Sequence, residues 1–241
     1  MATFVLIHGA MHGGWCWRPV EALLREAGHL AHAPTLTGMG DRAHLLSPEV
    51  GVDTHVADVV ATLRMEDVRD GVLVLHSYAG VLAGPVAQAA GSRVGHVVAM
   101  GAFLADPGEC LADVEPPGVV ERYRRLVADE GQGWRVPASA AFMDQWSLPD
   151  GLRGVVGPRL TDFPARCVDD RVAYDRAALD ALPRDYVEHT APRLASLAAT
   201  VERARERGWR MHQMATSHDL MLEDPAGTAR LLMEIMSCAA A

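Results

Sequence analysis

The chain of 241 residues contains no lysine, so all 22 of its basic residues are arginine. Without a lysine amine, Schiff-base catalysis and a phosphate-binding P-loop are excluded. Acidic residues number 31, which gives a formal net charge of −9. Because an acidic chain does not attract phosphate groups broadly, we expect no nucleic acid partner.

Cysteines are few, and no two of them form a C-x-x-C pair, so the sequence predicts neither a disulfide framework nor a zinc site. No apolar run reaches the roughly 18 residues that a membrane helix needs, and we expect no membrane partner. The apolar run at Phe4 lacks a basic leader and a cleavage site, which predicts a first strand rather than a signal peptide. We therefore expect a cytoplasmic protein that acts on a small molecule without a metal or other cofactor. The four cysteines are Cys16, Cys110, Cys167 and Cys238.

Short apolar runs alternate with longer helical patterns along most of the chain. This rhythm predicts an α/β fold, in which helices cover both faces of a mostly parallel sheet. The predicted strands are Thr3–His8, Leu30–Pro34, Gly71–Leu75, Val97–Gly101, Asp185–His189 and Arg210–Met214. The predicted helices are Pro19–Ala27, Val52–Leu63, Ala79–Ala90, Leu194–Glu206 and Pro225–Met236.

One long stretch, residues 104–182, interrupts the rhythm with polar helices, prolines and glycines but no convincing strand. Because it precedes the penultimate strand, we expect a helical lid over the strand ends. Residues 1–103 and 183–241 then form the core, and the whole chain makes one domain.

The strongest signal for chemistry is VLVLHSYAG (residues 72–80), an apolar strand that ends in Ser77 and passes at once into a helix. This context is typical of a nucleophile elbow, whose turn also aims the amide of Tyr78 at an anion formed beside the serine. The pattern departs from G-x-S-x-G at Leu75 and Ala79. We expect the bulk of Leu75 to crowd the helix that passes nearby. A serine that merely caps a strand–helix turn is the alternative.

Two further segments fit the same chemistry. FVLIHGAMHGGW (residues 4–15) places glycines after the first strand, where backbone amides can approach a ligand closely. TSHD (residues 216–219) follows the last strand, so His218 could take a proton from Ser77 and later protonate the leaving group. By themselves, these segments also fit a plain glycine-rich connection and a surface histidine.

Together the three motifs resemble the α/β-hydrolase superfamily, within it the methylesterase, hydroxynitrile lyase and pyrethroid-hydrolase-like group of small esterases. The resemblance extends from HGAMHGGWCW near the start, through LHSYAG, to SHD near the end. It implies an α/β-hydrolase fold with Ser77 as nucleophile and His218 as base. It also implies that the amides of Ala10 and Tyr78 form the oxyanion hole.

In this fold a carboxylate normally orients the base, but both usual positions lack one. After the penultimate strand the chain reads HTAPR (residues 189–193), and the preceding strand ends at Gly101. We favour Glu188, which could reach into the space left beside Gly101. Asp106 is an alternative, and a Ser–His dyad without an acid stays open. Asp219 adjoins the base, but its side chain should point away from the His218 ring.

The main functional hypothesis is a serine hydrolase that cleaves a carboxylic ester or lactone through an acyl-enzyme at Ser77. An alternative is a lyase, cyclase or elimination enzyme in which His218 is the base. Hydroxynitrile lyases of the group carry threonine and lysine at the positions of Gly9 and Asp219, which argues against cyanohydrin cleavage. A catalytically weak ligand-binding protein is a second alternative, supported by Leu75 and the missing acid.

Large apolar side chains in residues 104–182 indicate an apolar or aromatic substrate, unless they form only the core of the segment itself. They are Trp134, Phe142, Met143 and Trp146. We place Trp146 in the substrate pocket together with Gly9 and Met11. The sequence predicts no oligomeric state.

Overall fold

The computed structural model describes residues 1–239, with side chains described as far as residue 237. Its centre is a six-stranded sheet in which every neighbouring pair is parallel, in the order β2-β1-β3-β4-β7-β8. The strands are β1 Thr3–Ile7, β2 Leu30–His32, β3 Gly71–His76, β4 Val94–Met100, β7 Arg184–His189 and β8 Arg210–Met214. All six lie where the hydrophobic runs predict strands.

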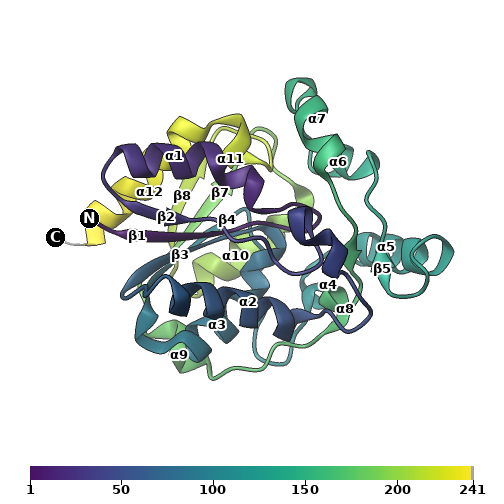
Figure 1. Cartoon of the computed structure of the whole chain (residues 1–241), viewed down its shortest axis with the longest axis horizontal. Helices are drawn as coiled ribbons and strands as arrows, with labels where there is room; N and C mark the ends of the chain where they lie inside the picture. Colours follow the sequence, from purple (N-terminus) through teal and green to yellow (C-terminus); the bar gives the residue numbers. More distant parts are fainter. Residues whose placement is uncertain (240–241) are drawn as a thin grey trace.

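Helices cover both faces of the sheet, as predicted (Figure 1). One face carries α1 (Arg18–Glu26), α11 (Leu220–Glu223) and α12 (Pro225–Ala239). The opposite face carries α2 (Val52–Met65), α3 (Ala83–Ala90) and α10 (Ala198–Glu206). The sheet is therefore the middle of three layers.

Alternate residues of the buried strands supply two separate hydrophobic cores. In β3, Val72 and Val74 pack in the core beneath α1 and α12, whereas Leu73 and Leu75 pack in the core beneath α2 and α3. Successive side chains of a strand point to opposite faces, so a strand buried on both sides needs this continuous apolar run. The expected crowding by Leu75 is not observed, because its side chain is fully buried in the second of these cores.

A 3₁₀ helix, η3 (Ser77–Leu82), links β3 to α3, where a single helix from Ala79 is predicted. Gly80 permits this tight turn to lie against the residues that follow β4. A Cβ atom on Gly80 would stand 2.4 Å from the Phe103 carbonyl oxygen and 2.8 Å from the Ala102 Cβ. The helix prediction is thus wrong for its first turn, where close packing replaces the α-helical geometry.

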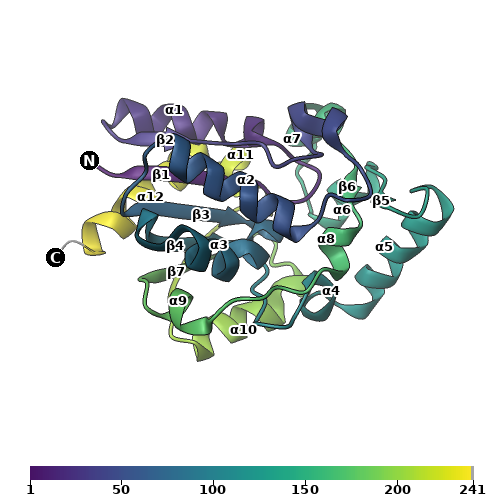
Figure 2. The ribbon, with the colours of Figure 1, turned by 60° about the horizontal axis from the view of Figure 1, so that its bottom comes forward.

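Most of residues 104–182, here called the inserted segment, lies beyond the carboxyl ends of the strands (Figure 2). The expectation of no strand there is wrong, because two short strands pair antiparallel. The last helix of the segment packs beside α3 on the core. Its elements are α4 Leu111–Val114, α5 Pro117–Asp129, β5 Arg135–Val136, α6 Ala141–Gln145, α7 Asp150–Val156, β6 Phe163–Pro164, α8 Arg166–Asp169 and α9 Arg176–Asp180.

Three cysteines, Cys16, Cys110 and Cys167, are free thiols in buried positions. The side chain of Cys238 lies outside the described residues. Within residues 1–239, no helix combines the length and the apolar character needed to cross a bilayer.

Replacing Gly80 by alanine is expected to destabilise the fold by about 1–3 kcal/mol, because a new Cβ would be forced against backbone atoms. Gly151 in α7 is a matched control, since a Cβ there meets no atom within 4 Å. Gly151→Ala should raise stability by up to about 1 kcal/mol through helix propensity. Urea unfolding of both variants checks this, and equal shifts in their midpoints would contradict the packing argument.

Candidate active site

Ser77 stands at the carboxyl end of β3 with a φ of 54°. A non-glycine residue in this left-handed region is strained by about 1–3 kcal/mol, and such strain is typical of functional turns. Gly9, after β1, leaves the room that the turn needs. A Cβ on Gly9 would lie 2.7 Å from the Ser77 Cβ.

The Ser77 hydroxyl contacts His218, which follows β8 in the sequence. The Ser77 Oγ and the His218 Nε2 are 3.0 Å apart. On the other side of the ring, the His218 Nδ1 lies 3.2 Å from the Nε2 of His189, at the end of β7. The His189 Nδ1 in turn lies 3.1 Å from the Pro192 carbonyl oxygen.

These contacts fix the protons on both rings. Pro192 offers only an oxygen acceptor, so the Nδ1 of His189 must donate and its Nε2 must accept. The Nδ1 of His218 then donates to His189, which leaves the Nε2 of His218 free to accept the proton of Ser77. The tautomer required of a general base is thereby set by a neutral histidine.

The prediction that Glu188 partners His218 is wrong. Neighbouring residues of a strand point to opposite faces, so residues two apart share a face. Glu188 therefore points to the same face as Tyr186, the face that carries α10. There the carboxylate pairs with Arg193 at 2.8 Å and also accepts from the Gln213 amide at 2.9 Å. His189, one residue later, reaches His218 instead.

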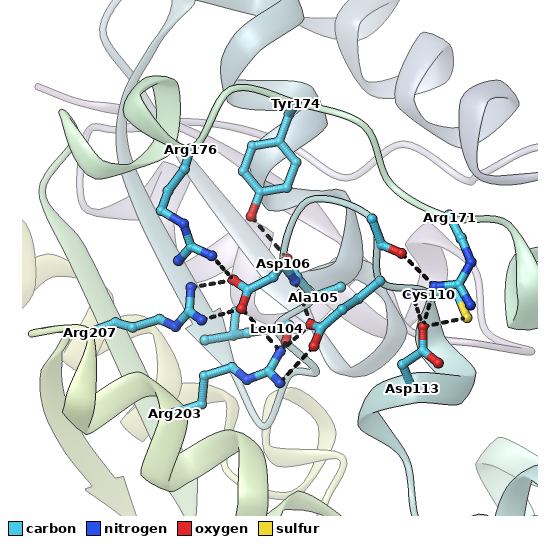
Figure 3. Close-up of polar contacts among 12 residues, drawn as sticks. Leu104, Ala105, Asp106, Cys110, Asp113, Arg171, Tyr174, Arg176, Arg203 and Arg207 are labelled. Carbon is cyan, nitrogen blue, oxygen red and sulfur yellow. Dashed lines mark hydrogen bonds and ion pairs between the residues drawn. The ribbon is translucent and has the colours of Figure 1, made fainter.

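Asp106, the alternative acid, is also elsewhere. Figure 3 shows its carboxylate enclosed by Arg176 and Arg207. The Arg176 guanidinium lies 2.7 Å from the carboxylate. Its charge is thus neutralised at the start of the inserted segment, remote from the contacts of His218.

The predicted space beside Gly101 exists, but the His189 ring fills it. A Cβ on Gly101 would lie 2.9 Å from the Cδ2 of His189 and 3.5 Å from the Nδ1 of His218. The space into which the Glu188 carboxylate is predicted to reach is therefore occupied by an imidazole. His189 ends the penultimate strand, close to the position expected for the acid. It is missed when only Asp and Glu are considered as partners of the base.

Ala10 and Tyr78 both line the cavity beside Ser77 and His218. The peptide that contains the Ala10 amide is held through its carbonyl, since the His8 Nδ1 lies 2.8 Å from the Gly9 oxygen. Likewise, the peptide that contains the Tyr78 amide is held by the Phe103 amide, 3.0 Å from the Ser77 oxygen. In a trans peptide the N–H points opposite to the carbonyl. The hydrogen bond to each carbonyl therefore also fixes the direction of the N–H in the same peptide.

A buried pair joins the loops that carry these groups. The His12 Nε2 lies 3.0 Å from the Asp219 carboxylate, and the His12 Nδ1 lies 2.9 Å from the Ala10 oxygen. Although burial opposes it, the Asp219 charge raises the pKa of His12, and His12 holds the pKa of Asp219 below its usual value. As expected, the Asp219 side chain pairs away from the His218 ring.

The other histidines around Ser77 are held neutral. Burial lowers the pKa of His8 to about 3 and that of His76 to about 4. Burial and the neighbouring imidazoles also lower the pKa of His218 well below its ordinary value. His218 is therefore unprotonated at neutral pH.

A narrow cavity of about 20 Å³ separates Ser77 from the inserted segment. Met11 and Trp146 line it, as predicted, whereas Gly9 lies behind Ser77 and does not. Trp134 lines a separate surface pocket. The whole lining is Ala10, Met11, Ser77, Tyr78, Phe103, Leu111, Glu115, Tyr123, Phe142, Gln145, Trp146, Phe163, Leu194, Ser196 and His218.

A larger open pocket of about 610 Å³ lies on the far side of His189, between Glu188 and α10. Although this pocket is larger, Ser77 does not line it. The narrow cavity, which Ser77 and His218 both line, is therefore the candidate active site.

A parallel sheet with helices on both faces, a serine on a left-handed turn after β3 and a histidine after the last strand define an α/β-hydrolase-fold protein. Comparison with known families agrees, because residues 4–231 match the model of the alpha/beta hydrolase family. The chain belongs to this family.

Among curated proteins, the chain is similar to a carbendazim hydrolyzing esterase of Nocardioides sp. (strain SG-4G), with 43% identity over 116 residues, 48% of either chain. It is also similar to an alpha-hydroxynitrile lyase of Arabidopsis thaliana, with 27% identity over 124 residues, 51% of this chain and 46% of the lyase. The matched region spans about half the length of these relatives. Plant methylesterases and a pyrethroid hydrolase are further relatives, so the group inferred from the motifs is confirmed.

The fold is similar to that of an extracellular alpha/beta-hydrolase from a Paenibacillus species. The TM-score is 0.85 and the identity 21%, over 98% of this chain and 99% of that one. At this identity the likeness concerns the fold alone.

Acid should destabilise the protein well above the pH at which carboxylates titrate. His8 and His76 bind protons only after unfolding between pH 6.5 and their lowered pKa values of about 3 and 4. Each therefore removes about 1.4 kcal/mol of stability per pH unit as the pH falls through this range. The contribution of His12 has the opposite sign, because its raised pKa stabilises the folded state below pH 6.5.

Urea unfolding at several pH values between 6.5 and 5 measures the net slope. We expect the free energy of unfolding to fall by at least about 1.4 kcal/mol per pH unit, the slope that one extra proton bound by the unfolded state produces. Stability that stays constant or rises over this range would show that these histidines are not buried in the neutral form.

Proposed function

We propose that the protein is a serine hydrolase that cleaves a small carboxylic ester or lactone through an acyl-enzyme at Ser77. The main support is the 3.0 Å contact between the Ser77 Oγ and the His218 Nε2, made by a serine with a φ of 54°. The relatives named as esterases favour this chemistry over others on the same fold. No cofactor takes part in it.

In the proposed reaction, the Ser77 Oγ attacks the ester carbonyl carbon while its proton passes to the His218 Nε2. The negative charge that develops on the carbonyl oxygen is received by the amides of Ala10 and Tyr78. His218 then protonates the departing alcohol, which leaves the acyl group on Ser77. Water, deprotonated by His218, attacks the acyl-enzyme and restores the serine.

His189 is a positioning residue in this scheme. It accepts the Nδ1 hydrogen of His218 and so holds the tautomer that receives the Ser77 proton. Unlike a carboxylate, a neutral imidazole adds no negative charge to stabilise the imidazolium. The contribution of His189 should therefore be smaller than that of the usual acid.

The substrate proposed is apolar or aromatic near the ester. Phe103, Phe142, Trp146 and Phe163 line the cavity, and Phe142 stacks on Trp146 with 5.7 Å between ring centroids. The inserted segment supplies the last three of these rings, so we assign it the role of a lid. A cavity of about 20 Å³ holds no ester, so these side chains must move when substrate enters.

Cyanohydrin cleavage is disfavoured at this site. A side chain at the position of Gly9 would collide with Ser77, since even a Cβ would lie 2.7 Å from the Ser77 Cβ. Asp219, where hydroxynitrile lyases of the group carry lysine, is buried and paired with His12. Other eliminations with His218 as base remain the alternative that the following experiment separates.

Ser77→Ala should lower the hydrolysis of p-nitrophenyl esters by at least about 10³-fold, because the attacking oxygen is lost. His218→Ala should lose nearly as much, and the double variant little more, since the two groups act as one unit. A fluorophosphonate probe should label wild type at Ser77. Retention of more than a tenth of the rate by Ser77→Ala would refute covalent catalysis.

His189→Ala should lower kcat/KM by about tenfold, the effect of one neutral hydrogen bond, rather than the roughly 10⁴-fold typical of a lost triad carboxylate. Glu188→Gln is the matched control from the adjacent strand position and should leave the rate near wild type. In addition, His189→Asp should move the acid limb of the pH–rate profile to higher pH, because a carboxylate raises the pKa of His218. A larger loss in Glu188→Gln than in His189→Ala would reverse the assignment.

A further inference from the structure

One carboxyl group lies in the otherwise largely apolar cavity above Ser77. Glu115 directly follows α4, is only 7% exposed and lines the cavity together with Ser77, Phe142 and Trp146. No step of the proposed reaction uses this side chain. Burying a carboxyl group among aromatic rings is costly unless its oxygens are paired.

Only one of the two oxygens has a partner. The Tyr123 hydroxyl donates to the Oε1 of Glu115 at 3.2 Å, whereas the Oε2 is buried without any partner in the described part of the chain. Arg122, which adjoins Tyr123 on α5, is engaged elsewhere. Its guanidinium contacts Gln145 at 2.9 Å and lies 4.4 Å above the Phe142 ring.

Glu115 therefore favours its neutral, protonated form at pH 7. Burial raises its pKa to about 8, and the hydrogen bond from Tyr123 only partly opposes this. With Oε1 accepting from Tyr123, the acidic proton resides on Oε2. The cavity thus contains an unused hydrogen-bond donor.

The backbone that leads to Glu115 is clamped by ion pairs (Figure 3). Arg203 binds Glu109, and Arg171 contacts the Asp113 carboxylate at 2.8 Å. Asp113 also accepts from the Cys110 amide at 3.0 Å and so closes the first turn of α4. The carboxyl group is consequently positioned before any ligand arrives.

We propose that Glu115 determines substrate specificity by donating its Oε2 hydrogen to a neutral acceptor, a ring nitrogen or carbonyl oxygen, on the substrate away from the scissile ester. This inference rests on the proposed ester hydrolysis at Ser77. A substrate with an acceptor satisfies the orphaned oxygen, whereas a purely hydrocarbon group leaves it unpaired. An anionic group is excluded, because no arginine among the described residues lines the cavity to balance its charge.

A purely structural role for Glu115 does not explain the free oxygen. In a purely structural role the unpaired buried oxygen would only cost stability, about 1–3 kcal/mol. Leucine would fill the same volume without that cost. The energy is recovered when a ligand supplies the acceptor, which is how binding sites obtain selectivity from polar groups.

Isosteric esters test the inference, because replacing one ring CH by nitrogen adds an acceptor without changing shape. The p-nitrophenyl esters of phenylacetate and of the three pyridylacetates present the ring on the acyl side, and benzyl and pyridylmethyl acetates present it on the alcohol side. At pH 7 at least one pyridyl ester should be preferred over its phenyl counterpart. Glu115→Leu should reduce this ratio of kcat/KM values by about tenfold or more.

Glu115→Gln is the matched control, because its amide keeps a donor of similar size. It should retain most of the preference, and comparing ratios between variants cancels the intrinsic reactivity of the esters. In wild type the preference should vanish above about pH 8, as Glu115 ionises, but not in Glu115→Gln. The other titratable groups that line the cavity, Tyr78, Tyr123 and His218, have pKa values displaced far from 8.

The outcomes separate the two proposals. If wild type hydrolyses these esters but the pyridyl-to-phenyl ratio is the same in Glu115→Leu, the specificity role is refuted and ester hydrolysis stands. If wild type hydrolyses none and Ser77 resists the fluorophosphonate probe, the proposed function itself fails. A Glu115→Leu variant that melts at lower temperature with an unchanged ratio would assign Glu115 a structural role instead.

Discussion

Ser77 occupies the end of β3 with a φ of 54°, a conformation that side-chain-bearing residues avoid, and its neighbours leave space for this conformation. Gly9 admits the turn from the side of β1, and Gly80 lets the following 3₁₀ helix lie against the residues after β4. The same turn presents the hydroxyl to His218 and places Tyr78 at the cavity. In the proposed reaction the nucleophile, its contact with the base and one oxyanion donor thus depend on a single strained residue.

Around that turn the site is built largely from neutral imidazoles. His8 holds the peptide of the Ala10 amide, His76 donates to the His218 carbonyl at 2.9 Å, and His189 orients the base. Burial keeps each ring neutral, so each can donate at one nitrogen, and His8 and His189 also accept at the other. Charge enters only through the His12–Asp219 pair, which ties the loop after β1 to the loop after β8.

The proposed lid adds recognition to this machinery. Its aromatic rings line the cavity beside Ser77, and in our proposal Glu115 supplies a single donor among them. The ion pairs of Asp106, Glu109 and Asp113 lie outside the cavity and fix the segment that carries Glu115. Charged residues thus hold the base of the inserted segment, whereas the surface toward Ser77 is mostly apolar.

The sequence by itself determined the sheet and the positions of its strands, and its motifs at strand ends predicted that Ser77 and His218 act together, because these features follow from local periodicity and order along the chain. It did not determine the partner of His218. Glu188 and His189 are adjacent, and which of the two reaches the base depends on the face to which each side chain points and on the path of the loop after β8. Likewise, the sequence does not show that one oxygen of Glu115 lacks a partner. Which groups reach a buried oxygen depends on how α4, α5 and α6 pack in the tertiary structure.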